Sequence, residues 1–340
     1  MERISSIDIC KGLLIILVVM VHVPLALDRV GLDYPYVRFL TNSTCYFYTG
    51  FFMPAFFLVS GYASNFNKPV RQFLMSNVKG LLLPLLSLGV LSKIVELLAF
   101  GDSFWTITTG EVNYFFLVET LWFLSAMFVA RILYWGVYHT FRKDYMRGLA
   151  MLLLLVVGVA LNHLHPEVQD PSHYHNFFHY RNAMCLSVFL WMGSAARHHG
   201  ISRKAVYCLG IAYLPFLGLS WLLPVFRPVP YTDSTTLTLL QIPQFLLFAV
   251  TGTAFMMMIA CMFKKNRILE FLGKNTLVIY GAHFLLLRCC VGVTYSWVDA
   301  NSKWESVIYY FFLLFATLLL SSALSLFFNR KPASVFIGKF

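Results

Sequence analysis

Long apolar stretches recur along this 340-residue chain, and they constrain its fold more than any other feature. A helix needs about 20 mostly apolar residues to cross the hydrocarbon core of a bilayer, and about ten stretches meet that requirement. We expect membrane-spanning helices at residues 8–27, 43–65, 78–100, 112–138, 147–163, 182–198, 204–223, 237–263, 274–296 and 304–328. The sequence therefore predicts an all-α, polytopic membrane protein, organised as a single integral membrane domain over residues 1–340.

The composition excludes an ordinary soluble domain. Only 12% of the residues are charged and 59% are hydrophobic, whereas soluble domains carry about 25% charged residues. Aromatic residues make up 17% of the chain, which suits lipid-facing helices with Trp and Tyr at the interfaces. The seven cysteines include no Cys-x-x-Cys pair. We therefore expect packing roles for them, without a disulfide framework or a zinc site.

The basic residues that give the net charge of +11 indicate how the chain is oriented in the membrane. They do not indicate a nucleic-acid partner. The basic residues occur in twos and threes between apolar stretches, and they form no continuous basic surface. Alternate connections hold most of them: Lys68, Arg71 and Lys79; Arg142, Lys143 and Arg147; Arg197, Arg203 and Lys204; Lys264, Lys265, Arg267 and Lys274. Cytoplasmic loops carry the Lys/Arg excess, so both termini are predicted to face the cytoplasm.

The largest outward connection, residues 164–181, is polar, aromatic and rich in histidine. It is the one extramembrane stretch long enough to help form an outward binding surface. Its histidines, with His163 before them, lack a familiar metal-ligand spacing. Solvated or glycan-contacting side chains are the favoured interpretation, and no metal site is predicted.

Three ionisable residues lie on the first predicted helix. Such residues inside a membrane are costly and are functional candidates by default. Eleven residues turn an α-helix through about three circles plus 20°, so Lys11 and His22 share a face, about 16 Å apart along the axis. Asp8 lies one turn before Lys11 and can pair with it. Lys11 would hold an anionic head group at the cytoplasmic mouth, and His22 would act deeper as a general base.

A structural interpretation of the same residues stays open. Lys11 would then be a cytoplasmic anchor, and His22 would hydrogen-bond a neighbouring helix. Two roles likewise stay open for Lys68 and Arg71: binding the phosphates of a donor, or binding acidic lipid head groups. Further polar or aromatic residues within the predicted spans point to a cavity in the bundle: Ser60, Glu119, Trp122, Arg131, Tyr280 and His283. For Ser60, close helix packing is the favoured role.

An ordered set of short motifs resembles acyltransferase family 3, and in particular its fucose 4-O-acetylase-like branch. The motifs are Asp8-x-x-Lys11-Gly12 with His22, Phe57-Leu58-Val59-Ser60-Gly61-Tyr62, Lys68-x-x-Arg71, Leu121-Trp122-Phe123-Leu124 and Leu272-Gly273-Lys274-Asn275-Thr276-Leu277-x-x-Tyr280-x-x-His283. The resemblance implies O-acylation, usually acetylation, of a sugar hydroxyl in a surface polysaccharide or its lipid-linked precursor. It also implies cytoplasmic acyl-CoA as donor, no further cofactor, and a bacterial inner membrane.

The resemblance implies roles for particular residues. His22 matches the family pattern and is the expected catalytic residue, either as a base or as an acyl carrier. Lys11, Lys68 and Arg71 are expected to bind the CoA phosphates, and the outward connection to contact the glycan. The family commonly has arginine where this chain has Lys11 and Lys68. Lysine keeps the charge but lacks the bidentate fork of arginine.

Two other functions compete with the enzyme. A polysaccharide or small-solute transporter would use Lys93, Glu96, Arg131 and His283 as a polar pathway. Transporters usually show repeated halves and broken helices, and neither is evident here. A non-catalytic assembly partner in envelope synthesis is the third interpretation. Consumption of acyl-CoA separates the enzyme from both.

The predicted topology is testable with paired reporter fusions. A fluorescent protein that matures only in the cytoplasm is expected to be fluorescent when it is fused at the C-terminus. Alkaline phosphatase, which is active only outside the cytoplasm, is expected to be active in the connection before Lys303 and inactive at the C-terminus. The reverse pattern would contradict the orientation.

Overall fold

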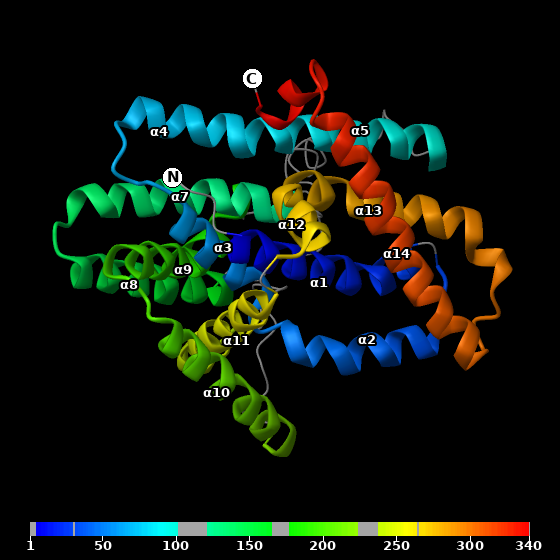
Figure 1. Ribbon diagram of the computed structural model, residues 1–340, viewed down its shortest axis with the longest axis horizontal. Helices are drawn as coiled ribbons and strands as arrows, with labels where there is room; N and C mark the ends of the chain where they lie inside the picture. The colour runs from blue at the N-terminus through cyan, green and yellow to red at the C-terminus, as the bar shows by residue number, and fades with distance from the viewer. Residues whose placement is uncertain are drawn as a thin grey trace.

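The computed structural model describes residues 5–29, 31–100, 121–164, 177–223, 237–263 and 265–339, and within these ranges every regular element is helical (Figure 1). Seven helical segments of this described part are long and apolar enough to cross a membrane. The predicted all-α, polytopic architecture is thereby confirmed. The number of spans, about ten by length and composition, stays a prediction.

The helices fall into three groups along the chain. The first contains α1 (Ser5–Arg29), α2 (Pro35–Tyr48), α3 (Phe52–Ala63), α4 (Val70–Asn77), the π-helix η1 (Val78–Leu82) and α5 (Leu83–Phe100). The second contains α7 (Trp122–Thr140), α8 (Asp144–Leu164), η4 (Phe177–His179), α9 (Tyr180–His199) and α10 (Arg203–Leu222). The third contains η6 (Leu239–Gln241), α11 (Ile242–Met262), α12 (Arg267–Lys274), α13 (Thr276–Thr294), η7 (Tyr295–Trp297), α14 (Lys303–Phe328) and η8 (Ala333–Ile337).

Two predicted spans differ from the observed helices. The stretch 43–65 is two helices, because the chain turns at Thr49, Gly50 and Phe51 between α2 and α3. Pro54 then lies in the first turn of α3, where its missing N–H costs nothing. The stretch 78–100 continues a helix that begins earlier, so that α4, η1 and α5 form an almost continuous rod (Figure 1).

Helix α1 is the central element of the bundle. It packs against α2, α3, α11, α12, α13 and α14, and Figure 1 shows it in dark blue between them. Its apolar residues point in all directions, as expected for a helix surrounded by other helices. Ile9, Leu14, Val18 and Val23 are fully buried. The functional candidates on α1 are therefore held in the middle of the protein.

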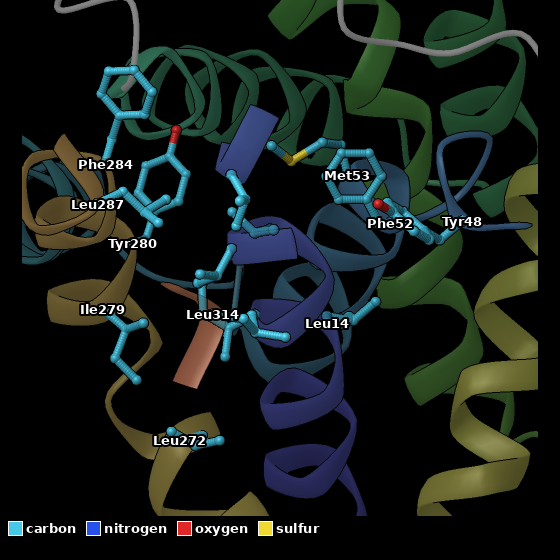
Figure 2. Packing of buried hydrophobic residues seen from close by; sticks show 14 of the residues in the cluster. Leu14, Tyr48, Phe52, Met53, Leu272, Ile279, Tyr280, Phe284, Leu287 and Leu314 are labelled. Carbon is cyan, nitrogen blue, oxygen red and sulfur yellow. The ribbon is translucent and has the colours of Figure 1, made fainter. Parts of the chain in front are cut away.

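The buried apolar residues form two cores that meet at α3. One core surrounds α1 and includes Phe52 and Met53 of α3, and part of it is shown in Figure 2. The other lies among α7, α8 and α9 and includes Phe57 of α3. Leu81, Trp122 and Phe123 pack against both cores. The space between the cores is where the candidate site lies.

Two glycines allow α12 to lie directly against α1. A Cβ at Gly12 would overlap the carbonyl oxygen of Leu269, and a Cβ at Gly273 would overlap that of Asp8. The obstacle in both cases is backbone, which cannot rotate away as a side chain can. This contact fixes the N-terminal half of α1, including Asp8 and Lys11, relative to the start of α13.

Replacing Gly273 with alanine is expected to destabilise the protein. The added methyl group must push α12 away from α1, and overpacking of this kind typically costs about 1–3 kcal/mol. Gly136→Ala on α7 is the control, because a Cβ at Gly136 meets no atom within 4 Å. Thermal unfolding of both variants in detergent measures the difference. Equal melting temperatures would contradict the assigned contact.

Candidate functional site

A cavity of about 580 Å³ lies between the two cores. Its walls are formed by α1, α3, α7 and α13, with α4 and η1 closing one side. Its volume is in the range of about 300–1,000 Å³ that is typical of ligand pockets. Five of the residues singled out from sequence line it: Lys11, Ser60, Lys68, Arg131 and Tyr280.

The helices contribute residues at helical spacing. On α1 the lining residues are Lys11, Ile15 and Val18, and His22 is the next position on the same face. On α13 they include Thr276 and Tyr280, and His283 follows one turn later. The shared face of Lys11 and His22 that the sequence predicts is thus a wall of the cavity, with His22 one turn beyond its lined part.

The cavity is polar at one end and apolar at the other. Ser64, Asn65 and Lys68 lie where α3 gives way to α4, and Asn65 is exposed, so this end reaches the surface. Met53, Phe56, Phe123 and Leu124 line the opposite part. Such a gradient suits an amphipathic ligand whose charged group stays at the surface end.

Lys11 is paired at the polar end. Its Nζ lies 3.9 Å from Oδ1 of Asp8, and Asp8 is almost completely buried. This is the one-turn pairing expected from the sequence. The ion pair holds the ammonium group at the cavity wall, and the Lys11 side chain remains 27% exposed.

His22 and His283 meet at the deep end. Their ring centroids are 4.6 Å apart, and the rings stand at 77° to each other. Nδ1 of His22 lies 2.6 Å from the carbonyl oxygen of Val18, and Nδ1 of His283 lies 2.6 Å from that of Tyr280. A carbonyl oxygen can only accept, so Nδ1 carries the proton in each neutral ring.

The fixed tautomer leaves Nε2 of both rings with a lone pair. His283 is completely buried, and its Nε2 has no hydrogen-bond partner. Buried polar atoms are almost always satisfied, and an exception calls for an explanation such as a catalytic role or a bound molecule. Two ring nitrogens with lone pairs therefore lie one turn beyond the lined part of the cavity.

Tyr280 connects this histidine pair to α7. Its hydroxyl oxygen accepts the Phe123 N–H at 3.3 Å, and its ring centroid lies 5.7 Å from that of His283. Figure 2 shows the Tyr280 ring beside Phe284, with the hydroxyl pointing away from α13. The bond satisfies one of the N–H groups that the first turn of every helix leaves without an intrahelical acceptor.

The remaining sequence candidates lie elsewhere. Arg71 is exposed on α4 and does not line the cavity. Trp122 packs beside His179, with ring centroids 6.2 Å apart. Glu119 lies outside the described residues, as does the outward connection over 165–176. Within the described ranges, no three His, Cys, Asp or Glu side chains are grouped as metal ligands.

The buried polar residues that the sequence analysis did not single out include Asn77, which directly follows Ser76 of the cavity lining. Asn77 is 0% exposed, and neither its Nδ2 nor its Oδ1 has a hydrogen-bond partner. It lies four residues after Phe73 and four before Leu81, both packed against the cores. The four-residue spacing from Phe73 and to Leu81 places Asn77 on the same buried face of the helix. This spacing is the feature of the sequence from which its burial could have been predicted.

Comparison with known proteins identifies the family. The family model for acyltransferase family 3, described as an acyltransferase domain, matches residues 4–326. The match covers nearly the whole chain, and the chain belongs to this family. No curated protein and no solved structure matches it.

With its long apolar helices, the protein is a multi-pass membrane acyltransferase. The family favours the enzyme over the transporter and the assembly partner. The fucose 4-O-acetylase-like branch stays a prediction.

Tyr280→Phe is expected to lower the free energy of unfolding by about 1–3 kcal/mol, because the buried Phe123 N–H loses its acceptor. Thermal unfolding in detergent measures the loss. Tyr145→Phe is the control, since Tyr145 is 67% exposed. If the two variants unfold at the same temperature as the wild type, the hydroxyl has no role in holding α7 on α13.

Proposed function

We propose that this protein transfers an acyl group, in the first instance acetyl, from cytoplasmic acyl-CoA to a sugar hydroxyl of a surface polysaccharide or its lipid-linked precursor. The observation that carries the proposal is the cavity that leads from Lys11 and Lys68 towards the His22–His283 pair. A bacterial inner membrane is part of the proposal, with the donor entering from the cytoplasm.

The polarity of the cavity supports acyl-CoA as the donor. Its phosphates would bind Lys11 and Lys68 at the surface end, with Arg71 near the entrance. The pantetheine arm and the acyl group would extend along the apolar wall formed by Met53, Phe56 and Phe123. About 16 Å of axial distance separates Lys11 from His22, so the thioester would reach the histidines while the phosphates stay at the mouth.

The fixed tautomer of His22 gives it the role of base. Nε2 takes the proton of the acceptor hydroxyl as that oxygen attacks the thioester carbonyl. The carbon–sulfur bond then breaks, and the imidazolium returns its proton to the leaving CoA thiolate. The products are the O-acyl sugar and free CoA. The hydrogen bond from Nδ1–H to Val18 stabilises the imidazolium form during this exchange.

A covalent route uses the same atom. Nε2 of His22 attacks the thioester carbonyl and the carbon–sulfur bond breaks, which gives an acyl-imidazolium whose Nδ1 keeps its proton, and CoA thiolate. The acceptor oxygen then attacks the acyl carbon and the bond to Nε2 breaks. In this route His283, with its own unpartnered Nε2, takes the hydroxyl proton and later releases it to the thiolate or to water. Incubation with labelled acetyl-CoA in the absence of acceptor separates the routes, because only the covalent route leaves label on His22.

The central test is acyl transfer from labelled acetyl-CoA to a crude glycan-lipid extract, in membranes with matched amounts of protein. His22→Ala is expected to lower the rate by about 10²–10⁴-fold, the usual contribution of a general base. His139→Ala is the control, because exposed His139 makes the same local bond, from Nδ1 to the carbonyl oxygen of Trp135 at 2.9 Å. A folded His22→Ala protein with full activity would remove His22 from the mechanism.

A further inference from the structure

We propose that Arg131, on the cavity wall, and Asn77, buried beside it, form a second anion subsite that binds the diphosphate of the acyl-CoA donor. The proposal rests on the function proposed above and adds two binding residues to Lys11 and Lys68. It arises from polar atoms that are buried at the junction of α4, η1 and α7 and have no hydrogen-bond partner.

Arg131 belongs to the cavity wall. It follows Leu124 and Met127 on one face of α7, and all three line the cavity. Its Nε is buried without a hydrogen-bond partner, and among the described residues its guanidinium forms no ion pair with a carboxylate. The centroid of the Phe66 ring lies 6.0 Å from its Cζ atom, which is a weak cation–π contact.

An arginine on this wall favours an anion in the cavity. The guanidinium group of arginine keeps its positive charge in proteins. A buried charge that no partner compensates is strongly unfavourable. The guanidinium also presents a planar fork that matches two phosphate oxygens, whereas lysine acts as a point charge. Arg131 therefore suits a diphosphate better than Lys11 or Lys68 does.

Asn77 points to the same place independently. Phe73 of α4 stacks on Trp135 of α7, with centroids 5.5 Å apart and planes 20° from parallel. One turn later on α4 is Asn77, and one turn earlier on α7 is Arg131. The next turn brings Leu81 and Met127, and both line the cavity. This antiparallel register places the unsatisfied amide at the level of the unsatisfied guanidinium.

The backbone beside Asn77 is also unusual. The π-helix η1 begins directly after it, at Val78. Single π-turns within α-helices occur frequently at functional sites. Here the π-helical segment, Val78–Leu82, is itself packed against α7. An amide with two donor hydrogens at this point can join Arg131 in binding phosphate oxygens.

The test compares acetyl-CoA with acetyl-pantetheine, which lacks the diphosphate. Arg131→Gln is expected to raise the KM for acetyl-CoA by about 10- to 100-fold, as for loss of a hydrogen bond to a charged group, with little change in kcat. The KM for acetyl-pantetheine is expected to stay the same. Arg142→Gln is the control, because Arg142 is exposed in the connection before α8.

Asn77→Leu separates a binding role from a structural one. An apolar side chain of similar size removes a buried, unsatisfied amide, so the melting temperature is expected to rise. The KM for acetyl-CoA is expected to rise with it. A purely structural asparagine would not give a more stable protein that binds the donor more weakly.

Direct titration of the purified proteins with CoA distinguishes the two proposals. If the wild type binds CoA and Arg131→Gln binds it equally well, the subsite is overturned while the proposed function stands. If the wild type neither binds CoA nor transfers an acyl group, both are overturned. Weaker binding by Arg131→Gln, together with an unchanged KM for acetyl-pantetheine, supports the subsite.

Discussion

The hydrocarbon core of a bilayer offers no hydrogen-bond partner to a polar side chain, so each such group inside this bundle depends on the chain itself or on a ligand. Asp8 and Lys11 satisfy the requirement by pairing with each other. Tyr280 satisfies it by accepting an N–H from α7. His283, Arg131 and Asn77 retain unpartnered atoms although they are enclosed. These three residues lie on or near one cavity, and their unsatisfied polar atoms give that cavity its chemical character.

In the proposed function, the donor-binding groups and the reacting groups lie at opposite ends of the cavity. Cationic groups lie towards the exposed end near Asn65, and the histidine pair lies beyond the apolar part. Helix α1 carries both Lys11 and His22, so their separation is set by the rise of one helix and does not depend on the packing of two elements. The contact of Gly12 and Gly273 with neighbouring backbone fixes α12 and the start of α13 against that helix. A donor held at its phosphates would therefore meet the reactive atoms at a constant distance.

Much of the fold and of the candidate site could be predicted from the sequence, because both depend on the regular spacing of residues along a helix. The length of the apolar stretches predicted the all-α fold, and the eleven-residue interval predicted the shared face of Lys11 and His22. The same interval rule, applied to α4, would have placed Asn77 on a buried face with Phe73 and Leu81. The break between α2 and α3 was not predicted, since the turn at Gly50 lies within a continuous apolar stretch. The exposed position of Arg71 was equally hidden, because it depends on how α4 is rotated against α7.

The hydrogen bond at Nδ1 of His22 has a consequence for the working cycle. The bond closes onto the carbonyl of the preceding turn of the same helix, and His139 makes the same bond far from the cavity. It is therefore a property of the helix alone, and it survives any shift of α3, α7 or α13 relative to α1. Movements of the bundle that admit donor or acceptor would change which molecules reach Nε2, but they would leave the Nδ1 bond, and with it the tautomer, in place. In the proposed mechanism Nε2 therefore carries its lone pair before either substrate arrives, and the choice of substrate would depend on which molecules can reach that nitrogen.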